Sequence, residues 1–511
     1  MNDFALSLLL LGALSSGDQL PFWMTSNQFG LMPEGSGGLA LVQAGTQYDT
    51  TKDFQWKWGV SLAGNLDTRC PVTQGMTEGR TADFAAMVDE LYASARWRTF
   101  TLDVGMKHVD TDFLGVGVPT LGSMSTTGGH VVWSGNARTM PGYLISLDPV
   151  PVPLTHKLLW IRGAYGDFKM LDNRYVKETL VHRTKLYLML RILPRFEFQL
   201  GVDNVGLWGG TSPDYGPMPF TFNDYFRVVT GRSASNSGPM NDQINVIGDQ
   251  RGGALYRFDW HGNGWDAVLQ REIPYDDGSG MAGIQNWPDG VYTLWFGFDK
   301  KDHWVSDILF EYQHTMDQSG TYHDRPTTDE EKARLDPADP YHYYHHIYGG
   351  GDNYFNHSEY KSGWTYYGRT IGDPLISPMG THAGTWTGRQ MVLGVENNRL
   401  KAWHASLSGK LFRKAPYKLM LTYSQNYGTY WNQYLGESQW KKPRHTVKET
   451  PLHQVSGAFV GEVPFRTAGF LAPDSALRHL TLTYGLYADK GQLLSDVFGA
   501  SLGLRWDFRV R

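Results

Sequence analysis

Apolar and polar residues alternate along several stretches of this chain, and no other feature constrains its fold as much. At 54–62 the even positions are the apolar residues Phe54, Trp56, Trp58, Val60 and Leu62. Similar alternation occurs at 100–107, 417–424, 480–486 and 498–508. Successive side chains of a β-strand point to opposite faces of a sheet. Each stretch is therefore expected to form a strand with one apolar and one polar face.

Alternating strands suit either a soluble sandwich or propeller, or a transmembrane barrel. The polar positions here are mostly Gly, Ser and Thr, as a water-filled lumen requires, and strand ends carry aromatic residues, as a membrane interface requires. The last strand runs almost to residue 511, and a closed barrel needs such a strand to pair with its first one. We expect an all-β fold, one transmembrane antiparallel β-barrel over 1–511. The side chains expected to face lipid are Trp56, Val60, Leu102, Leu482 and Leu502.

Composition supports this choice. Aromatic residues make up 14% of the 511 residues and glycine occurs 59 times, yet mean hydropathy is −0.39. A bundle of membrane helices needs about 20 apolar residues for every span. The net charge of −5 gives no electrostatic case for nucleic acid. A single cysteine, Cys70, excludes an intrachain disulfide and a cysteine-based metal site.

The first residues allow two interpretations. The apolar segment 4–14 resembles a signal-peptide core but lacks the basic residues that precede one. We favour a first barrel strand, with the export signal outside this sequence. Short connections at 193–195 and 414–416 suit periplasmic turns. Long connections at about 110–130, 209–245 and 315–385 are expected outside the cell or inside the lumen. Within the last, 327–335 is predicted to form a short capped helix.

An ordered series of local motifs is spread over residues 20 to 430. They are PFWMTSNQFG at 21–30, SGNARTMP at 134–141, LWGG at 207–210, NDQINVIG at 241–248, YDDGSG at 275–280, EYQHTMDQSG at 311–320, GDNYFN at 351–356, SGW at 362–364 and GRTIG at 368–372. In this order and combination the chain resembles the Wzi family of capsule-assembly outer-membrane proteins, in its Bacteroidota form.

That resemblance implies a barrel of about 18 strands in the outer membrane of a Gram-negative cell, with a small helical or loop plug and a lumen largely closed by inward loops. It also implies a non-enzymatic, lectin-like role: binding capsular polysaccharide and helping to assemble or anchor the capsule. The chain departs from the family in lacking a long N-terminal helical segment. The plug is therefore expected to be reduced, or built from 110–130 and 325–338.

Glycan binding relies on aromatic faces and planar polar side chains, and acidic sugars add a need for arginine. The region 340–370 combines these residue types. The predicted polysaccharide-binding residues are Tyr343, Tyr344, Tyr354, Asn356, Lys361, Trp364 and Arg369. The alternative is that the aromatic residues of this region pack a loop or anchor it at the membrane interface.

Arg138, in the Gly-Asn-Ala-Arg motif, is expected to point into the lumen as a structural charge paired with a carboxylate. The histidines at 314, 323, 342, 345, 346 and 357 match no metal-site spacing and are expected to lie exposed in loops. No calcium-loop pattern surrounds Asp276, Asp277 or Asp352. No metal, cofactor or catalytic residue is predicted.

Three functions from different classes follow. The main hypothesis is a barrel that binds capsular or other surface polysaccharide, and the alternative is an outer-membrane pore for solutes or glycans. The third is an outer-membrane enzyme, for which only common acidic pairs such as Glu311 with Asp317 are available. The expected partners are surface polysaccharide and outer-membrane lipid, with a protein partner left open.

Overall fold

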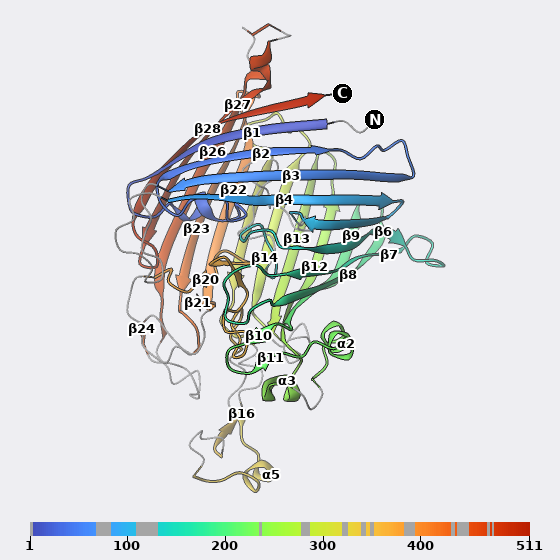
Figure 1. Cartoon of the computed structure of the whole chain (residues 1–511), viewed down its shortest axis with the longest axis vertical. Helices are drawn as coiled ribbons and strands as arrows, with labels where there is room; N and C mark the ends of the chain where they lie inside the picture. The colour runs from blue at the N-terminus through green and yellow to red at the C-terminus, as the bar shows by residue number, and fades with distance from the viewer. Residues whose placement is uncertain are drawn as a thin grey trace.

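Eighteen strands form one closed antiparallel sheet in the computed structural model of the chain (Figure 1). Each strand pairs with its neighbours along the barrel sequence, and the last pairs with the first. The predicted all-β barrel of about 18 strands is confirmed. The structure describes residues 4–67, 83–108, 131–234, 238–276, 287–318, 325–338, 344–347, 352–382, 394–430, 435–436, 449–467, 471–472 and 475–510.

The barrel strands are listed here in chain order, which is also their order around the wall. They are β1 (Phe4–Ser15), β2 (Gly37–Thr46), β3 (Phe54–Asp67), β4 (Asp83–Trp97), β5 (Phe100–Met106), β6 (Pro141–Pro151), β7 (Leu159–Lys169), β8 (Leu180–Leu193), β9 (Phe196–Trp208), β12 (Asp249–His261), β13 (Trp265–Asp276), β14 (Gly290–Phe298), β15 (Asp307–His314), β22 (Leu400–Leu411), β23 (Ala415–Asn426), β26 (Leu452–Pro464), β27 (Leu480–Gly491) and β28 (Val497–Val510).

The first strand closes the barrel. Phe4 lies opposite Val510 of β28 and opposite Thr46 of β2, so β1 is paired along both edges. The two ends of the chain lie side by side (Figure 1). Segment 4–14 is therefore a barrel strand, as predicted, because its backbone groups complete the hydrogen bonding that a lipid-exposed edge would otherwise leave unsatisfied.

The two ends of the barrel differ in the length of their connections. Short turns such as 98–99, 194–195 and 412–414 share one end with both termini. The other end carries 16–36, 209–248, 315–399 and 427–451. In outer-membrane barrels the short turns face the periplasm and the long loops face outside. The predicted positions of 193–195 and 414–416 agree with this assignment.

The remaining elements are short and belong mostly to the long connections. The helices are α1 (Phe22–Thr25), α2 (Phe222–Thr230), α3 (Met240–Ile244), α5 (Asp329–Lys332), η2 (Phe465–Thr467) and η3 (Ala476–His479). The strand pairs are β10 (Thr211–Ser212) with β11 (Gly216–Pro217), β16 (Arg325–Pro326) with β17 (His346–Ile347), β18 (Thr365–Tyr366) with β19 (Arg369–Thr370), β20 (Ser377–Pro378) with β21 (Val395–Asn397), and β24 (Leu435–Gly436) with β25 (Glu449–Thr450). Among the residues that the structure describes, no helix is long and apolar enough to cross a membrane.

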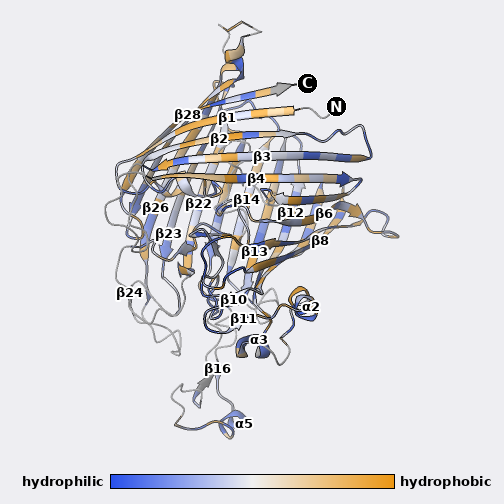
Figure 2. Ribbon diagram, in the orientation of Figure 1, coloured by the Kyte–Doolittle hydropathy of each residue, from blue (hydrophilic) through white to orange (hydrophobic). Residues whose placement is uncertain are grey.

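The two faces of the barrel wall differ in polarity, as the alternating sequence predicts. Leu502 is 61% exposed and Trp56 is 54% exposed, whereas Ser501, next to Leu502, and Ser61, farther along β3, are buried. Apolar and polar residues alternate along the strands (Figure 2). The apolar face is turned outward to lipid, and the polar face lines the lumen.

The predicted helix near 327–335 forms but does not plug the barrel. α5 has Thr328 as its N-cap, with a reciprocal capping box to Glu331. α5 and β16 project beyond the strand ends at the long-loop end (Figure 1). The expectation that 325–338 fills the lumen is wrong, since its charged, exposed residues give it nothing to bury there. The other proposed plug segment, 110–130, lies outside the described residues.

Candidate functional site

Two segments of the long connections, 131–140 and 353–379, fill part of the lumen, and together they are called the plug here. Their apolar side chains form one buried cluster with inward-facing wall residues, including Val181 of β8 and Val205 and Leu207 of β9. Trp364 at the centre has no exposed surface, and its Nε1 donates to the Val132 carbonyl oxygen. Burial of aromatic side chains on this scale holds the plug firmly in place.

Buried polar contacts attach the plug to the same half of the wall. Glu272 of β13 accepts a 2.9 Å hydrogen bond from the Val131 amide, at the start of the first plug segment. Arg183 of β8 forms a 2.6 Å ion pair with Asp203 of β9, and its guanidinium lies 4.5 Å from the Trp133 ring. The plug is therefore anchored to β8, β9 and β13 by both apolar and ionic contacts.

Asp289, just before β14, fixes the beginning of the β15–β22 connection. Its carboxylate accepts from the amides of Asp317 (2.9 Å) and Gln318 (2.7 Å) and from Nδ1 of His314 (2.9 Å). Burial raises the pKa of Asp289. His314 is the last residue of β15 and is buried, so its predicted exposure in a loop is wrong: its ring is needed inside, to bond this carboxylate.

A cavity of about 410 Å³ lies on the other side of the plug. It is bounded by the β1–β2 connection, by plug residues 367–379, by the inner face of β23, β26 and β27, and by the β27–β28 turn. Pockets that bind small molecules commonly enclose about 300–1,000 Å³. The turn residue Ser495 is exposed, so the cavity lies at the long-loop end of the lumen.

The wall side of the cavity carries hydroxyl, amide and carboxylate groups. The polar lining residues from the barrel strands are Thr422, Ser424, Asn426, Gln454, Ser456 and Asp489. Asp489 is 5% exposed, and its Oδ2 accepts a 2.7 Å hydrogen bond from the Phe22 amide. The hydroxyl of Ser456 also lies within hydrogen-bonding reach of this carboxylate. These groups can read the hydroxyls of a polar solute.

The short helix α1 packs against the inner face of this wall, and its residues Phe22 and Thr25 form the floor of the cavity. Trp23 is buried against Met420 of β23 and Ala458 of β26, and its Nε1 donates to Thr422 Oγ1 at 3.1 Å. The Trp23 ring also lies 5.3 Å from that of His404. α1 therefore separates the cavity from the wall positions nearer the short-turn end.

The plug side of the cavity contributes Tyr367 and Arg369, from the hairpin of β18 and β19. Arg369 Nη1 donates to the Thr25 carbonyl oxygen at 3.3 Å, which joins the plug to the end of α1. Arg138 borders the same hairpin, with its guanidinium 4.4 Å from the centre of the Tyr367 ring. Among the described residues Arg138 has no carboxylate partner, so the ion pair expected for it is replaced by this cation–π contact.

Three of the predicted polysaccharide-binding residues belong to the interior of the plug. Tyr354 and Trp364 are almost fully buried. The side-chain amide of Asn356 donates to the Val395 carbonyl oxygen and accepts from the Val395 backbone amide. Side chains enclosed in this way offer no face to a glycan in this conformation. The structure thus agrees with the alternative in which the aromatic residues of 340–370 pack a loop.

The other predicted binding residues are scattered. Lys361 is partly exposed and forms a 2.6 Å ion pair with Asp214, away from the cavity. Tyr344 lies near β16 and β17, while Tyr343 lies outside the described residues. Of the predicted polysaccharide-binding residues that the structure describes, only Arg369 lines the cavity. The sequence does not single out the cavity-lining residues of β23, β26 and β27 or helix α1 as site residues. The Pro-Phe-Trp motif at 21–23, which contributes the first residues of α1, does belong to the ordered series of motifs.

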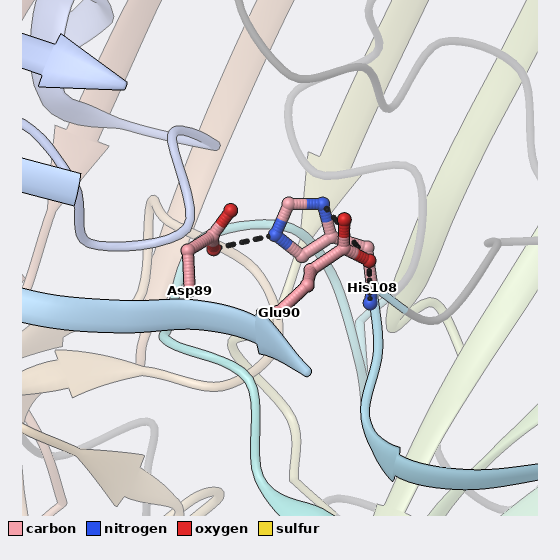
Figure 3. Close-up of side chains that lie close together, drawn as sticks. All are labelled: Asp89, Glu90 and His108. Carbon is pink, nitrogen blue, oxygen red and sulfur yellow. Dashed lines mark hydrogen bonds and ion pairs between the residues drawn. The ribbon is translucent and has the colours of Figure 1, made fainter. Parts of the chain in front are cut away.

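Two groups in the described residues have acids and a histidine close enough to suggest a metal: Asp289 with His314 and Asp317, and Asp89 with Glu90 and His108. Figure 3 shows the second group, in which His108 Nε2 lies 2.7 Å from Asp89 Oδ1. The His108 ring also stacks on Phe29 at 3.6 Å. These contacts join β4 to the end of β5 and to the β1–β2 connection, which is a structural role.

A second, smaller cavity of about 220 Å³ lies along β5 to β8 and reaches toward the short-turn end. Its lining includes Asp103, Lys107, Arg162, Lys185 and Tyr187. Its volume is about half that of the cavity along β23, β26 and β27, so the space that the plug leaves is unequally divided.

No protein-family model matches the chain, and no curated protein matches it. Solved structures with a similar course include Acinetobacter baumannii OccAB2, at 11% identity and a TM-score of 0.46, covering 100% of this chain and 98% of that one. They also include the outer membrane protein OpdK from Pseudomonas aeruginosa, at 11% identity and a TM-score of 0.45, covering 99% of both chains. A third is Pseudomonas aeruginosa OccK11 (OpdR), at 9% identity and a TM-score of 0.43, covering 100% and 96%.

The chain is a closed 18-stranded β-barrel with an apolar outer face, the architecture of transmembrane barrels of the outer-membrane type. None of these comparisons supports membership of the Wzi family or a role in the capsule, and both stay predictions from the sequence motifs.

Proposed function

We propose that the chain is an outer-membrane channel for small hydrophilic solutes, and that the 410 Å³ cavity is its outer vestibule. The observation that carries the proposal is the asymmetry of the lumen. The plug is packed against β8, β9 and β13, whereas the side next to β23, β26 and β27 keeps the larger cavity, with polar side chains on its wall side. A plug that only sealed the barrel would gain stability by packing against both sides.

The route from this vestibule toward the periplasm passes α1. The helix is only four residues long and is held to the wall by the bonds of Trp23 to Thr422 and of Phe22 to Asp489. Nearer the short-turn end, the inner wall carries Lys418 and the ion pair of Arg505 with Glu462. In this proposal, displacement of α1 opens the route from the vestibule to these charged wall residues, at the cost of the contact between Phe22 and the plug.

A channel is favoured over retention of a long surface polysaccharide because of where the aromatic residues lie. Capture of an extended chain calls for exposed aromatic faces. Tyr354, Tyr360 and Trp364 are instead enclosed in the plug. The cavity is the size of a small solute rather than of a polymer.

Solute uptake by liposomes that contain the purified barrel tests the proposal. We expect swelling in isotonic solutions of small sugars, and a several-fold slower rate for Ser456→Trp, which fills the vestibule. Val455→Trp is the matched control, because Val455 is the neighbouring residue on β26 and is exposed on the lipid face. Absence of swelling with the folded parent protein would contradict the channel, and equal rates for the parent and Ser456→Trp would contradict the location of its vestibule.

A further inference from the structure

At the long-loop end, β7 and β8 carry polar side chains on the face of the wall that is turned away from the lumen. Val181 of β8 belongs to the plug cluster and points inward, so the next residue, His182, points outward. Leu186, on the same face as His182, is 46% exposed and belongs to the lipid-facing band. His182 Nδ1 lies 2.9 Å from Oδ1 of Asp167, its neighbour on β7. An acid and a histidine therefore lie on the outer face, between the apolar band and the long loops.

The helix α2, in the β9–β12 connection, covers these two groups from outside. Tyr225 Oη donates to Asp167 Oδ2 at 2.7 Å, and the Tyr225 ring lies 5.6 Å from that of His182. Trp208, the last residue of β9, packs with Val228 of α2. Figure 1 shows α2 beside β8, at the long-loop end of the wall. α2 therefore lies on the outer surface of the barrel rather than over its opening.

The ends of α2 are fixed by its own sequence. Thr221 and Asp224 form a reciprocal capping box at its start, and Gly231 ends it in the left-handed conformation that glycine adopts without strain. The Val228 carbonyl oxygen accepts a 3.2 Å hydrogen bond from Gln250 Nε2 of β12. The helix is therefore held against the wall in one orientation, and its other sides point in defined directions.

The two sides of α2 that do not contact the wall differ in polarity. Phe222 and Phe226 are about one turn apart, so they share one side, and they are 86% and 52% exposed. Asn223 and Thr230 are also exposed and lie together on another side, because they are about two turns apart. A helix with one apolar and one polar side is typical of a membrane interface, where it lies with the apolar side among acyl chains and the polar side in water.

The size and position of the apolar side favour lipid over a protein partner. Phe220, Phe222 and Phe226 together expose about 400 Å², taking about 200 Å² for a whole phenylalanine side chain. A stable protein interface buries about 800 Å² on each partner. The apolar side also continues the lipid-facing band, because α2 packs on outward residues that follow Leu186 toward the long loops. Lipid that covers Leu186 needs no additional surface to reach α2.

We propose that α2 is a lipid-binding interfacial helix, whose apolar side is inserted among the acyl chains of the outer leaflet. In this position it shields the pair of Asp167 and His182 from the acyl chains, where uncovered polar groups are costly. It also sets the level at which this part of the wall leaves the membrane. The inference goes beyond the proposed channel and does not depend on it.

Photocrosslinking from α2 tests this proposal. The photoreactive amino acid p-benzoylphenylalanine replaces Phe222 or Phe226 in the folded full-length barrel, in vesicles of phosphatidylcholine and phosphatidylglycerol. Both rings are exposed, so the probe is compatible with the packing of the helix. After irradiation, protein–lipid adducts are measured by mass spectrometry. We expect adducts at both positions, with yields comparable to that of the same probe at Leu186, on the lipid-facing band.

Asn223 is the matched control, since it is the neighbour of Phe222 and is exposed on the polar side of α2. The probe at Asn223 is expected to give a several-fold lower yield of lipid adducts than at Phe222. Asp329 of α5, which projects beyond the strand ends, gives the background yield in water.

Three results would overturn the proposal. Equal yields at Phe222 and Asn223 would show that the apolar side is not the one that meets lipid. A yield at Phe222 no higher than at Asp329 would place α2 in water. A crosslink between two copies of the chain, in place of the lipid adduct, would make the apolar side a protein interface. If the barrel with the probe at Phe222 fails to fold, the probe at Phe226 decides.

Discussion

Neighbouring residues on β28 report which face of the wall meets lipid. Leu502 is 61% exposed and Ser501 is 9% exposed. An arginine on the lipid face near the bilayer midplane costs about 2–4 kcal/mol, and substitutions in the lumen cost less. We therefore expect Leu502→Arg to lower folding yield into vesicles far more than Ser501→Arg, as measured by heat-modifiable migration on gels. Equal impairment by the two substitutions would mean that the faces are assigned the wrong way round.

Two buried acids join the β9–β12 connection to the plug. Asp242 of α3 and Glu359 of the plug are almost fully buried, and Asp242 accepts a 3.0 Å hydrogen bond from the Gly248 amide. His357, Asp249, Arg174 and Tyr360 are the titratable groups around them. Burial is the main reason why the pKa of Glu359 is raised to about 9, and the charge of Asp242 and its hydrogen bond raise it further. The pair therefore shares a proton at neutral pH.

This pair makes attachment of α3 to the plug pH-dependent. A carboxyl whose folded-state pKa is raised contributes stability that is fully present below its unfolded value, here 4.5, and is lost as pH rises to about 9. Hydrogen exchange at 240–248, corrected for the intrinsic pH effect, should accelerate between pH 5 and pH 10. Glu359→Gln should flatten that profile. An unchanged profile in the variant would show that the pair does not hold the contact.

At the scale of elements, α1 is the part whose removal should matter most for passage through the lumen. Replacing a buried tryptophan by alanine typically costs about 3–5 kcal/mol. Trp23→Ala also removes the bond to Thr422. Because α1 contributes little to the wall, we expect the barrel to assemble and its single-channel conductance to rise.

Two further variants separate the effect of losing the Trp23 ring from the effect of losing its hydrogen bond to Thr422. Trp23→Phe keeps a ring but loses the indole N–H, so an intermediate conductance is expected. Trp56→Ala removes an indole from the lipid face and should leave conductance unchanged. If Trp23→Ala conducts like the parent protein, α1 is not the floor of the pathway.

The strands could be predicted from the sequence because a wall exposed to lipid on one face and water on the other imposes a two-residue period on every strand. Segment 4–14 lacks clear alternation, and the absence of basic residues before it is what favours a strand over a signal-peptide core. The plug could not be predicted in the same way. Segments 131–140 and 353–379 are irregular, so no period marks which side chains are buried.

In the candidate site, too, the sequence shows which residue types are present but does not show which of them the tertiary structure brings together. Aromatic residues near 340–370 are abundant, and abundance alone does not distinguish an exposed platform from a buried core, so composition predicts a binding role for Tyr354 and Trp364 although both are enclosed in the plug. Ser424, Ser456 and Asp489 are ordinary inward positions of three different strands. Their convergence depends on the side of the lumen that the plug leaves empty, which is a property of tertiary packing.

At the scale of the whole molecule the lumen is divided unequally, since the plug packs against β8, β9 and β13 and the larger cavity lies along β23, β26 and β27, where we propose the solute pathway. In this account the wide barrel provides a rigid frame, and the position of the plug decides where solutes pass. The pathway is therefore set by a few wall residues and by α1 rather than by the full width of the barrel.

Cysteine accessibility during conductance recording tests this claim most directly. In a Cys70→Ser background, Ser456→Cys and Val455→Cys are placed in planar bilayers, and a cationic methanethiosulfonate reagent is added on both sides. We predict a lasting stepwise fall in current for Ser456→Cys and none for Val455→Cys. Channels that conduct and stay unaffected by modification of Ser456→Cys, or a folded parent protein that does not conduct at all, would contradict the account.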